Sequence, residues 1–229
     1  MKGKLYGVGV GPGDPELMTL KALKVIRNSD VIALPGENPR DTTAWQIAVK
    51  VCPEIEEKEL LAVHMPMTKD KEKLEMSHRR GADAICALLK DEKQVAFLTL
   101  GDPTVYSTYL YIHKIIQAEG YPVEIISGIT SFTAVAAKLN IGLVEGSEPL
   151  HVVPASYQIE DSLKLPGTKV LMKAGKKMAD VKQQLKEHGS DVAMIENCGM
   201  STEKIYYGVD EIPEDAGYYS LLIVKGKQK

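Results

Sequence analysis

The residues best suited to hold a small molecule form a glycine-rich segment near the start of the chain, Gly7-Val8-Gly9-Val10-Gly11-Pro12-Gly13-Asp14. Glycine lets the backbone approach a ligand closely, and turns that follow strands lie where α/β sheets bind ligands. Pro12 replaces the third glycine of a dinucleotide fingerprint and no Gly-Lys-Ser/Thr follows, so a pyrophosphate site and a P-loop are both disfavoured. Asp14 and Glu16 favour a neutral or cationic ligand. The alternative is that the glycines only tighten a turn and Asp14 only caps a helix.

Two further turns carry small or acidic residues after apolar runs. The sequence LGDPTVY, residues 100–106, follows one run, and SGITS, residues 127–131, follows the next. Carboxyl ends of parallel strands lie on one edge of a sheet, so all three turns would face one crevice. Each turn alone could be structural, but three on one edge favour a small-molecule site.

Other chemistry has little support in the sequence. The three cysteines, Cys52, Cys86 and Cys198, are odd in number and far apart, so neither a disulfide framework nor a CxxC motif is expected. We expect reduced, structural cysteines. The histidines show no metal-ligand spacing, and we expect no metal site; they are His64, His78, His113, His151 and His188.

The first half of the chain alternates short β-branched runs with segments of helical periodicity. Strands are expected at residues 5–10, 31–34, 59–63, 94–100 and 123–127. Helices are expected from Asp14 and Pro15 onward, around residues 45–49, and at 71–90 and 104–119. This order predicts a doubly wound, mostly parallel α/β sheet.

The second half has a different pattern. Helices are expected at residues 131–139 and 178–188, and strands at 151–154, 169–173, 191–196, 204–209 and 218–225, the last three antiparallel. We therefore expect two domains: residues 1–127, an α/β domain with the glycine-rich loops, and residues 128–229, a mixed α/β domain.

Composition excludes several classes of protein. The 229 residues are 44% hydrophobic and 26% charged with a net charge of −3, which is typical of a globular chain without the basic excess of a nucleic-acid binder. No apolar run is long enough for a membrane span, and the start is unlike a signal peptide. We expect a cytoplasmic protein without nucleic-acid or membrane partners.

Several ordered motifs together resemble those of the tetrapyrrole (corrin and porphyrin) methyltransferases, over essentially the whole chain. They are LYGVGVGPGDPELMTLKALKVIRNSDVI, LGDPTVYSTY, SGITSFTAVAA, VLMKAG and VAMIENCGMSTEKIYYG. The resemblance implies a two-domain fold and S-adenosylmethionine as methyl donor. His64-Met65-Pro66-Met67, Ser107 and the long segment 35–92 are similar to the branch that methylates C-20 of precorrin-2 or cobalt-factor II in cobalamin biosynthesis.

The resemblance also implies where the cofactor binds, in a cleft between the two domains. Its binding residues would be Pro12, Leu100, Gly101, Asp102, Val105, Thr130 and Ser131, with Lys173, Ala174 and Cys198 from the second domain. Cys198 stands where several relatives have glycine. Asp102 and Tyr106 are the candidate catalytic residues, and His113 is a further candidate for removing the C-20 proton.

Basic residues are available for the carboxylates of a tetrapyrrole: Lys69, Lys71, Lys73, Arg79, Arg80, Lys176 and Lys177. They could equally form a solvated helix face. Gly81 is expected to bend or end the helix beside Arg80. The resemblance further implies a homodimer, with residues 218–224, Tyr109 and Tyr111 available for its interface.

Three other functions share some of these features. Another tetrapyrrole methyltransferase, acting on uroporphyrinogen III or a different ring carbon, would have the same cofactor motifs. Diphthine synthase methylates a protein side chain on this fold, but its relatives lack HMPM. A non-catalytic sensor would bind adenosine ligands without turnover.

Overall fold

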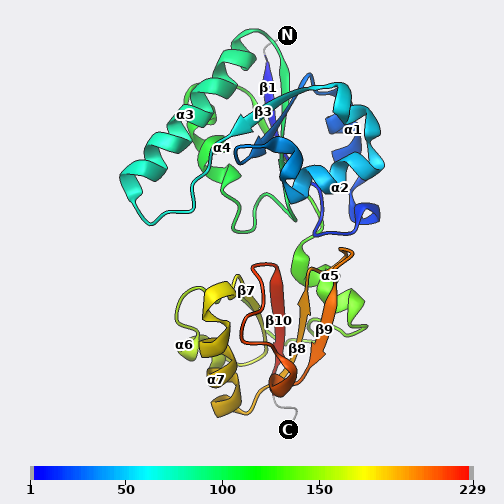
Figure 1. Cartoon of the computed structure of the whole chain (residues 1–229), viewed down its shortest axis with the longest axis vertical. Coiled ribbons are helices and arrows are strands. Elements are labelled where there is room, and N and C mark those ends of the chain that lie inside the picture. Colours follow the sequence, from blue (N-terminus) through cyan, green and yellow to red (C-terminus); the bar gives the residue numbers. More distant parts are fainter. Residues whose placement is uncertain (1–2, 227–229) are drawn as a thin grey trace. The chain divides into compact units, whose positions relative to one another are not determined.

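The computed structural model describes residues 3–226 and divides into two units, Met1–Thr130 and Ser131–Lys229 (Figure 1). The domain boundary expected after residue 127 falls in the same loop as this division. Each unit has its own sheet and its own apolar core.

The first unit is built on a five-stranded parallel sheet with the order β3-β2-β4-β1-β5. Its strands are β1 (Lys4–Gly9), β2 (Val31–Pro35), β3 (Glu59–Val63), β4 (Gln94–Thr99) and β5 (Val123–Ile126). The predicted doubly wound parallel sheet is confirmed. Its central strands are continuous apolar runs because both faces of the sheet are covered.

Helices cover both faces of this sheet, two on each face. One face packs against α1 (Leu20–Asn28) and α2 (Thr43–Val51), and the other against α3 (Lys71–Lys90) and α4 (Tyr109–Ala118). Short 3₁₀ turns lie at Pro15–Leu17, Pro39–Asp41 and Pro53–Glu57. The adjacent strands β1 and β4 are followed by helices on opposite faces, so the chain diverges at their carboxyl ends, which is where open α/β sheets bind ligands.

Two expected helix starts are wrong. Asp14 caps only the 3₁₀ turn, by accepting a hydrogen bond from the Glu16 N–H at 2.9 Å, whereas the Thr19 hydroxyl caps α1. Similarly α4 begins at Tyr109, because Tyr106 has a positive φ of 49° that breaks a helix.

Gly81 does not end its helix. α3 runs through it without interruption, and a Cβ at Gly81 would lie 2.6 Å from Val63 Cγ1. The glycine therefore permits α3 to pack closely on β3.

The second unit has a mixed sheet with the order β6-β7-β10-β8-β9. Its strands are β6 (Leu150–Pro154), β7 (Thr168–Met172), β8 (Asp191–Glu196), β9 (Lys204–Tyr207) and β10 (Ser220–Lys225). The predicted antiparallel pairing of β8 with β9 is confirmed. However, β10 inserts between β7 and β8, antiparallel to both, instead of following β9 as a meander would.

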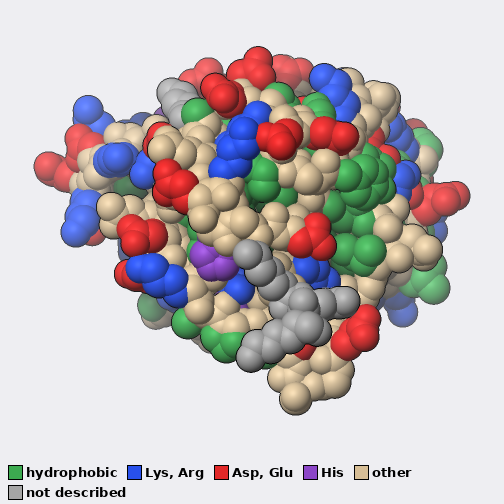
Figure 2. Space-filling view, turned by 90° about the horizontal axis from the view of Figure 1, so that it is seen from below, with side chains coloured by type: hydrophobic (Ala, Val, Ile, Leu, Met, Phe, Trp, Pro, Cys, Tyr) green, Lys and Arg blue, Asp and Glu red, His purple; other side chains and the backbone are tan. Residues whose placement is uncertain are grey.

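Helices flank the second sheet, as predicted. The helices α6 (Glu160–Leu163) and α7 (Met178–His188) pack on one face, and α5 (Ser131–Lys138) packs on the other. Short 3₁₀ turns lie at Gly175–Lys177 and Val209–Glu211. Within residues 3–226, no helix has the length and apolarity that crossing a bilayer requires. Acidic and basic side chains are interspersed on the face shown in Figure 2.

Candidate functional site

The three turns of the first unit meet at four glycines. Gly11 and Gly101 exchange backbone hydrogen bonds, with Gly101 N to Gly11 O at 2.8 Å and Gly11 N to Gly101 O at 3.4 Å. A Cβ on Gly9 would lie 2.5 Å from Gly101 O and 2.7 Å from Gly128 N. A side chain at Gly9 would therefore force the turns apart. Glycine at this position permits close packing between the turns as well as the shape of the first turn.

Asp102 ties the second turn to the third. It is only 8% exposed, and its Oδ1 accepts hydrogen bonds from the Thr104 N–H at 2.8 Å and the Thr104 hydroxyl at 2.5 Å. Its Oδ2 accepts the Gly128 N–H at 2.9 Å. Hydrogen bonds to a carboxylate are about twice as strong as neutral ones. With both oxygens engaged, Asp102 is suited to positioning the turns.

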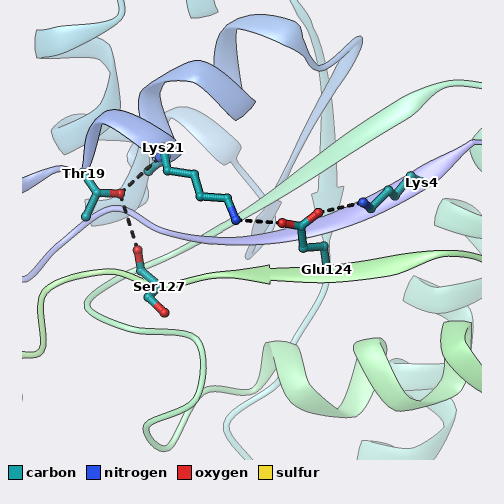
Figure 3. A network of polar contacts seen from close by, with 6 residues as sticks. Lys4, Thr19, Lys21, Glu124 and Ser127 are labelled. Atoms are coloured by element: carbon teal, nitrogen blue, oxygen red, sulfur yellow. Dashed lines mark hydrogen bonds and ion pairs between the residues drawn. The ribbon is translucent and has the colours of Figure 1, made fainter.

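A polar network holds the third turn against α1 (Figure 3). The Thr19 hydroxyl, which caps α1, lies 3.5 Å from the Ser127 carbonyl oxygen. On β5, Glu124 accepts hydrogen bonds from Lys21 at 2.8 Å and from Lys4 at 2.7 Å. These two ammonium groups, Lys21 foremost, hold the pKa of the Glu124 carboxyl below its usual value.

The predicted site residues of the first unit gather on the carboxyl edge of three neighbouring strands, β4, β1 and β5. They are Pro12, Leu100, Gly101, Asp102, Val105, Tyr106 and Thr130. Pro12 and Gly101 are buried, whereas Tyr106 is 44% exposed. The positive φ of Tyr106 is a strained backbone conformation of the kind that clusters at functional sites.

His113 lies apart from this edge. Its Nδ1 is 3.0 Å from the Tyr109 hydroxyl, and Tyr109 is fully buried in the core between the sheet and α4. Burial raises the pKa of Tyr109 and lowers the pKa of His113. The Tyr109 ring occupies the space that a Cβ on Gly7 would need. Tyr109, which is hydrogen-bonded to His113, therefore packs directly against the backbone of β1 at Gly7.

The second unit places Lys173, Ala174 and Cys198 at one edge of its own sheet. Lys173 and Ala174 follow β7, and Cys198 follows β8. Both strands run antiparallel to β10, which lies between them, so their carboxyl ends share an edge. Ser131 begins α5, which packs on the same apolar cluster as Cys198.

Backbone strain marks this edge as well. Lys173 has a φ of 58° and Asn197 a φ of 54°. The Asn197 N–H donates to the Tyr219 carbonyl at 3.1 Å, which fixes the β8 end against β10. Partial burial lowers the pKa of the Lys173 ammonium. Asn197 was not among the residues predicted from the sequence, although asparagine directly after a strand is a signal for positive φ.

The basic side chains of α3 differ in their surroundings. Arg79 Nε lies 2.9 Å from Asp83, and Arg79 Nη1 lies 2.7 Å from Glu119, so Arg79 connects α3 to the end of α4. Arg80 is exposed. The side chain of Lys176 lies outside the described residues. Among those that are described, no three His, Cys, Asp or Glu side chains are placed to hold a metal ion.

Comparison with known proteins identifies the family. The model of the Tetrapyrrole (Corrin/Porphyrin) Methylases matches residues 4–211. The chain is 36% identical to a probable cobalt-precorrin-2 C(20)-methyltransferase of Methanocaldococcus jannaschii, over 97% of this chain and 96% of that protein. It is 30% identical to the cobalt-precorrin-2 C(20)-methyltransferase of Salmonella typhimurium, over 98% of this chain and 97% of that protein.

Solved structures show the same fold. A cobalt-precorrin-4 methyltransferase superposes with a TM-score of 0.75 at 20% identity, covering 97% of this chain and 94% of that one. The uroporphyrin-III C-methyltransferase of Thermus thermophilus complexed with S-adenyl homocysteine gives a TM-score of 0.70 at 22% identity, with 97% of each chain covered. The resemblance stated from the motifs is confirmed, and the chain belongs to the tetrapyrrole (corrin/porphyrin) methylases.

Proposed function

We propose that the chain transfers a methyl group from S-adenosylmethionine to C-20 of precorrin-2 or cobalt-factor II in cobalamin biosynthesis. The observation that carries this proposal is the 36% identity, over 97% of the chain, to a relative named as a C(20)-methyltransferase. A relative named for C(11), from Priestia megaterium, matches only 58% of the chain at 28% identity. A uroporphyrinogen III methyltransferase of Methanosarcina barkeri matches 90% of the chain at 29% identity.

The glycine turns of the first unit suit S-adenosylmethionine. A Cβ built on Gly101 would meet nothing nearer than the Ile129 carbonyl at 3.9 Å, so space beside this backbone is open to a ligand. Backbone groups there can hydrogen-bond the adenosine and methionine parts, and the acidic side chains Asp14 and Asp102 favour a sulfonium. In this proposal the binding residues are those expected from the family motifs, with Lys173, Ala174 and Cys198 contributed by the second unit.

The protein contributes mainly orientation to this reaction. Bound S-adenosylmethionine supplies an activated methyl group, and a meso carbon of a reduced tetrapyrrole is electron-rich. Holding the two reactants in line can lower the barrier by about 7–11 kcal/mol. Asp102 fits the role of fixing the turns that hold the cofactor, and Tyr106, exposed on the same edge, is available to the substrate.

A substrate panel tests the proposal. Incubation with S-adenosylmethionine and either precorrin-2 or cobalt-factor II should add one methyl group to the tetrapyrrole. The reaction is monitored by mass spectrometry and by the visible absorption spectrum. If uroporphyrinogen III were methylated and neither precorrin-2 nor cobalt-factor II were, the chain would be a uroporphyrinogen III methyltransferase. That result would overturn C-20 specificity. Binding of S-adenosylmethionine without turnover of any tetrapyrrole would support a sensor.

We also propose that the enzyme is a cytoplasmic homodimer. Part of the expected interface is wrong, because Tyr109 and residues 221–224 are buried inside their own units. Tyr111, Tyr218 and Tyr219 are exposed by 55%, 47% and 41%, and exposed aromatic side chains favour an interface. Light scattering should give the dimer mass, and a monomer mass at every concentration would contradict it.

A further inference from the structure

A polar pair lies on the carboxyl edge of the first sheet, on β2 and β3, the two strands to one side of β4. Glu37 follows β2 and His64 follows β3, and His64 Nδ1 lies 3.9 Å from Glu37 Oε1. The backbone bond from Gly36 N to Val63 O, at 2.8 Å, brings the two strand ends together. The imidazole remains accessible, since the side chain is 56% exposed.

The backbone that carries His64 is also anchored on its carboxyl side. The Ser77 hydroxyl of α3 donates to the His64 carbonyl oxygen at 2.6 Å. The next residue, Met65, packs against the apolar cluster beneath α3 and α4. A fixed backbone and an accessible ring are what a residue acting on a bound molecule requires.

The other histidines are engaged away from this edge. His78 stacks on Tyr111 with the ring centroids 4.6 Å apart, and His113 bonds Tyr109 within the core. In the second unit, His151 contacts the Pro166 carbonyl and His188 the Ser190 hydroxyl. His64 is thus the one histidine placed beyond the strand ends of the first sheet within residues 3–226.

The sheet order sets the separation from the cofactor turns. The strand β3 is two positions from β4, and strands are about 4.8 Å apart, so His64 lies roughly 10 Å across the edge from Gly101. The base must act on C-20, the same carbon that receives the methyl group, so in this proposal C-20 lies between His64 and the cofactor turns. Asp102 at the turns is less suited to take a proton, because its oxygens already accept three hydrogen bonds.

We propose that His64 is the catalytic base that removes the C-20 proton. This inference rests on the proposed function. C-20 bonds to the methyl carbon while the carbon–sulfur bond breaks and its electron pair stays on sulfur, leaving S-adenosylhomocysteine. The C–H bond at C-20 then returns its electron pair to the ring, and the proton passes to Nε2 of the neutral imidazole. The Glu37 carboxylate, 3.9 Å from Nδ1 and 88% exposed, makes no hydrogen bond to the ring, and its negative charge attracts the imidazolium through solvent.

The test compares His64→Ala with His188→Ala, a histidine on the second unit, and with Tyr106→Phe. Loss of a general base lowers kcat by about 10²–10⁴-fold, and His64→Ala should show this with unchanged affinity for S-adenosylhomocysteine by calorimetry. Added imidazole should restore part of the rate, because the ring is accessible. In the His64→Ala variant, substrate deuterated at C-20 should react more slowly than substrate with ordinary hydrogen at C-20. His188→Ala should resemble the wild type.

Different results would overturn the assignment. They are a His64→Ala rate within a few fold of the wild type, a loss that imidazole does not restore, or a proton-transfer defect found in Tyr106→Phe instead. Failure of the wild-type enzyme to methylate precorrin-2 or cobalt-factor II would overturn the proposed function itself, and is seen before any variant is compared.

Discussion

The Asp102 carboxylate accepts the backbone N–H of Gly128 at 2.9 Å and so joins turns that lie 26 residues apart in the chain. Gly128 packs on the backbone of Gly9 and Gly101, where a side chain has no room. One carboxylate thereby fixes the relative positions of the turns after β4 and β5. This relationship connects a residue of the Gly-Asp-Pro motif to the shape of the proposed cofactor site.

Asp102→Asn should weaken binding of S-adenosylhomocysteine. The amide group of asparagine cannot accept on both sides, so one of the hydrogen bonds to Thr104 or Gly128 is lost. A lost bond to a charged group costs about 1–3 kcal/mol, and transmitted to the site this is roughly 5–150-fold in Kd, measured by calorimetry.

Asp30→Asn is the matched control for this variant. Asp30 Oδ2 accepts the Gln94 N–H at 2.7 Å, a similar bond at the amino end of β4, opposite the turns. It should lower thermal stability without changing cofactor affinity. Equal affinities in wild type and folded Asp102→Asn would contradict the positioning role.

Gly101→Val should abolish cofactor binding. Gly101 has a φ of +70°, which a β-branched residue tolerates poorly, and the new side chain would enter space assigned to the ligand. Gly120→Val is the control, because Gly120 has a φ of +81° and open space around it at the end of α4. Both variants carry backbone strain, so retained affinity in folded Gly101→Val would show that the turn is only structural.

Glu124→Gln should destabilise the protein near neutral pH and not in acid. The folded-state pKa of Glu124 is lowered by Lys21 and Lys4, so its stabilising contribution is present above the unfolded pKa and is lost as pH falls through the folded value. Solvent screens this pair of bonds, because the Glu124 side chain is 34% exposed, and the effect should stay below about 1 kcal/mol.

Melting temperatures measured from pH 7 downward test this. The wild type and Glu124→Gln should converge in acid, whereas Glu75→Gln, at an exposed position of α3, should follow the wild type throughout. A constant difference at every pH would show that the loss comes from packing.

Arg80→Ala should raise the KM for the tetrapyrrole by roughly 5–150-fold, or about 1–3 kcal/mol, if its charge meets a substrate carboxylate. Arg79→Ala is the comparison, because Arg79 is already paired with Asp83 and Glu119 and should affect stability instead. Steady-state kinetics with cofactor affinity measured separately distinguishes the two. Unchanged KM in Arg80→Ala would make this helix face a solvated surface.

Much of the fold was predictable because its signals are local. Buried parallel strands are continuous apolar runs, and α3 and α7 begin and end where periodicity and charge change. The start of α1 was missed because Asp14 and Pro15 form a valid cap that a 3₁₀ turn uses first. The insertion of β10 between β7 and β8 depends on pairing across the sheet, which no local pattern encodes.

The site was predictable only in part, for a related reason. The edge that gathers the turns follows from strand ends, so its residues could be named. The bond between Asp102 and Gly128 depends on the register of β4, β1 and β5. The positive φ values of Tyr106 and Lys173 are imposed by surrounding structure, because these side chains do not favour them.

Locating the transferred methyl group is the most direct test of methylation at C-20. S-adenosylmethionine carrying a ¹³C-methyl group is incubated with the enzyme and precorrin-2 or cobalt-factor II, and the product is analysed by carbon and proton NMR. We expect a single labelled methyl group attached to C-20, with loss of the C-20 proton signal. A label on any other ring carbon, or no label in a tetrapyrrole while S-adenosylmethionine binds, would contradict it.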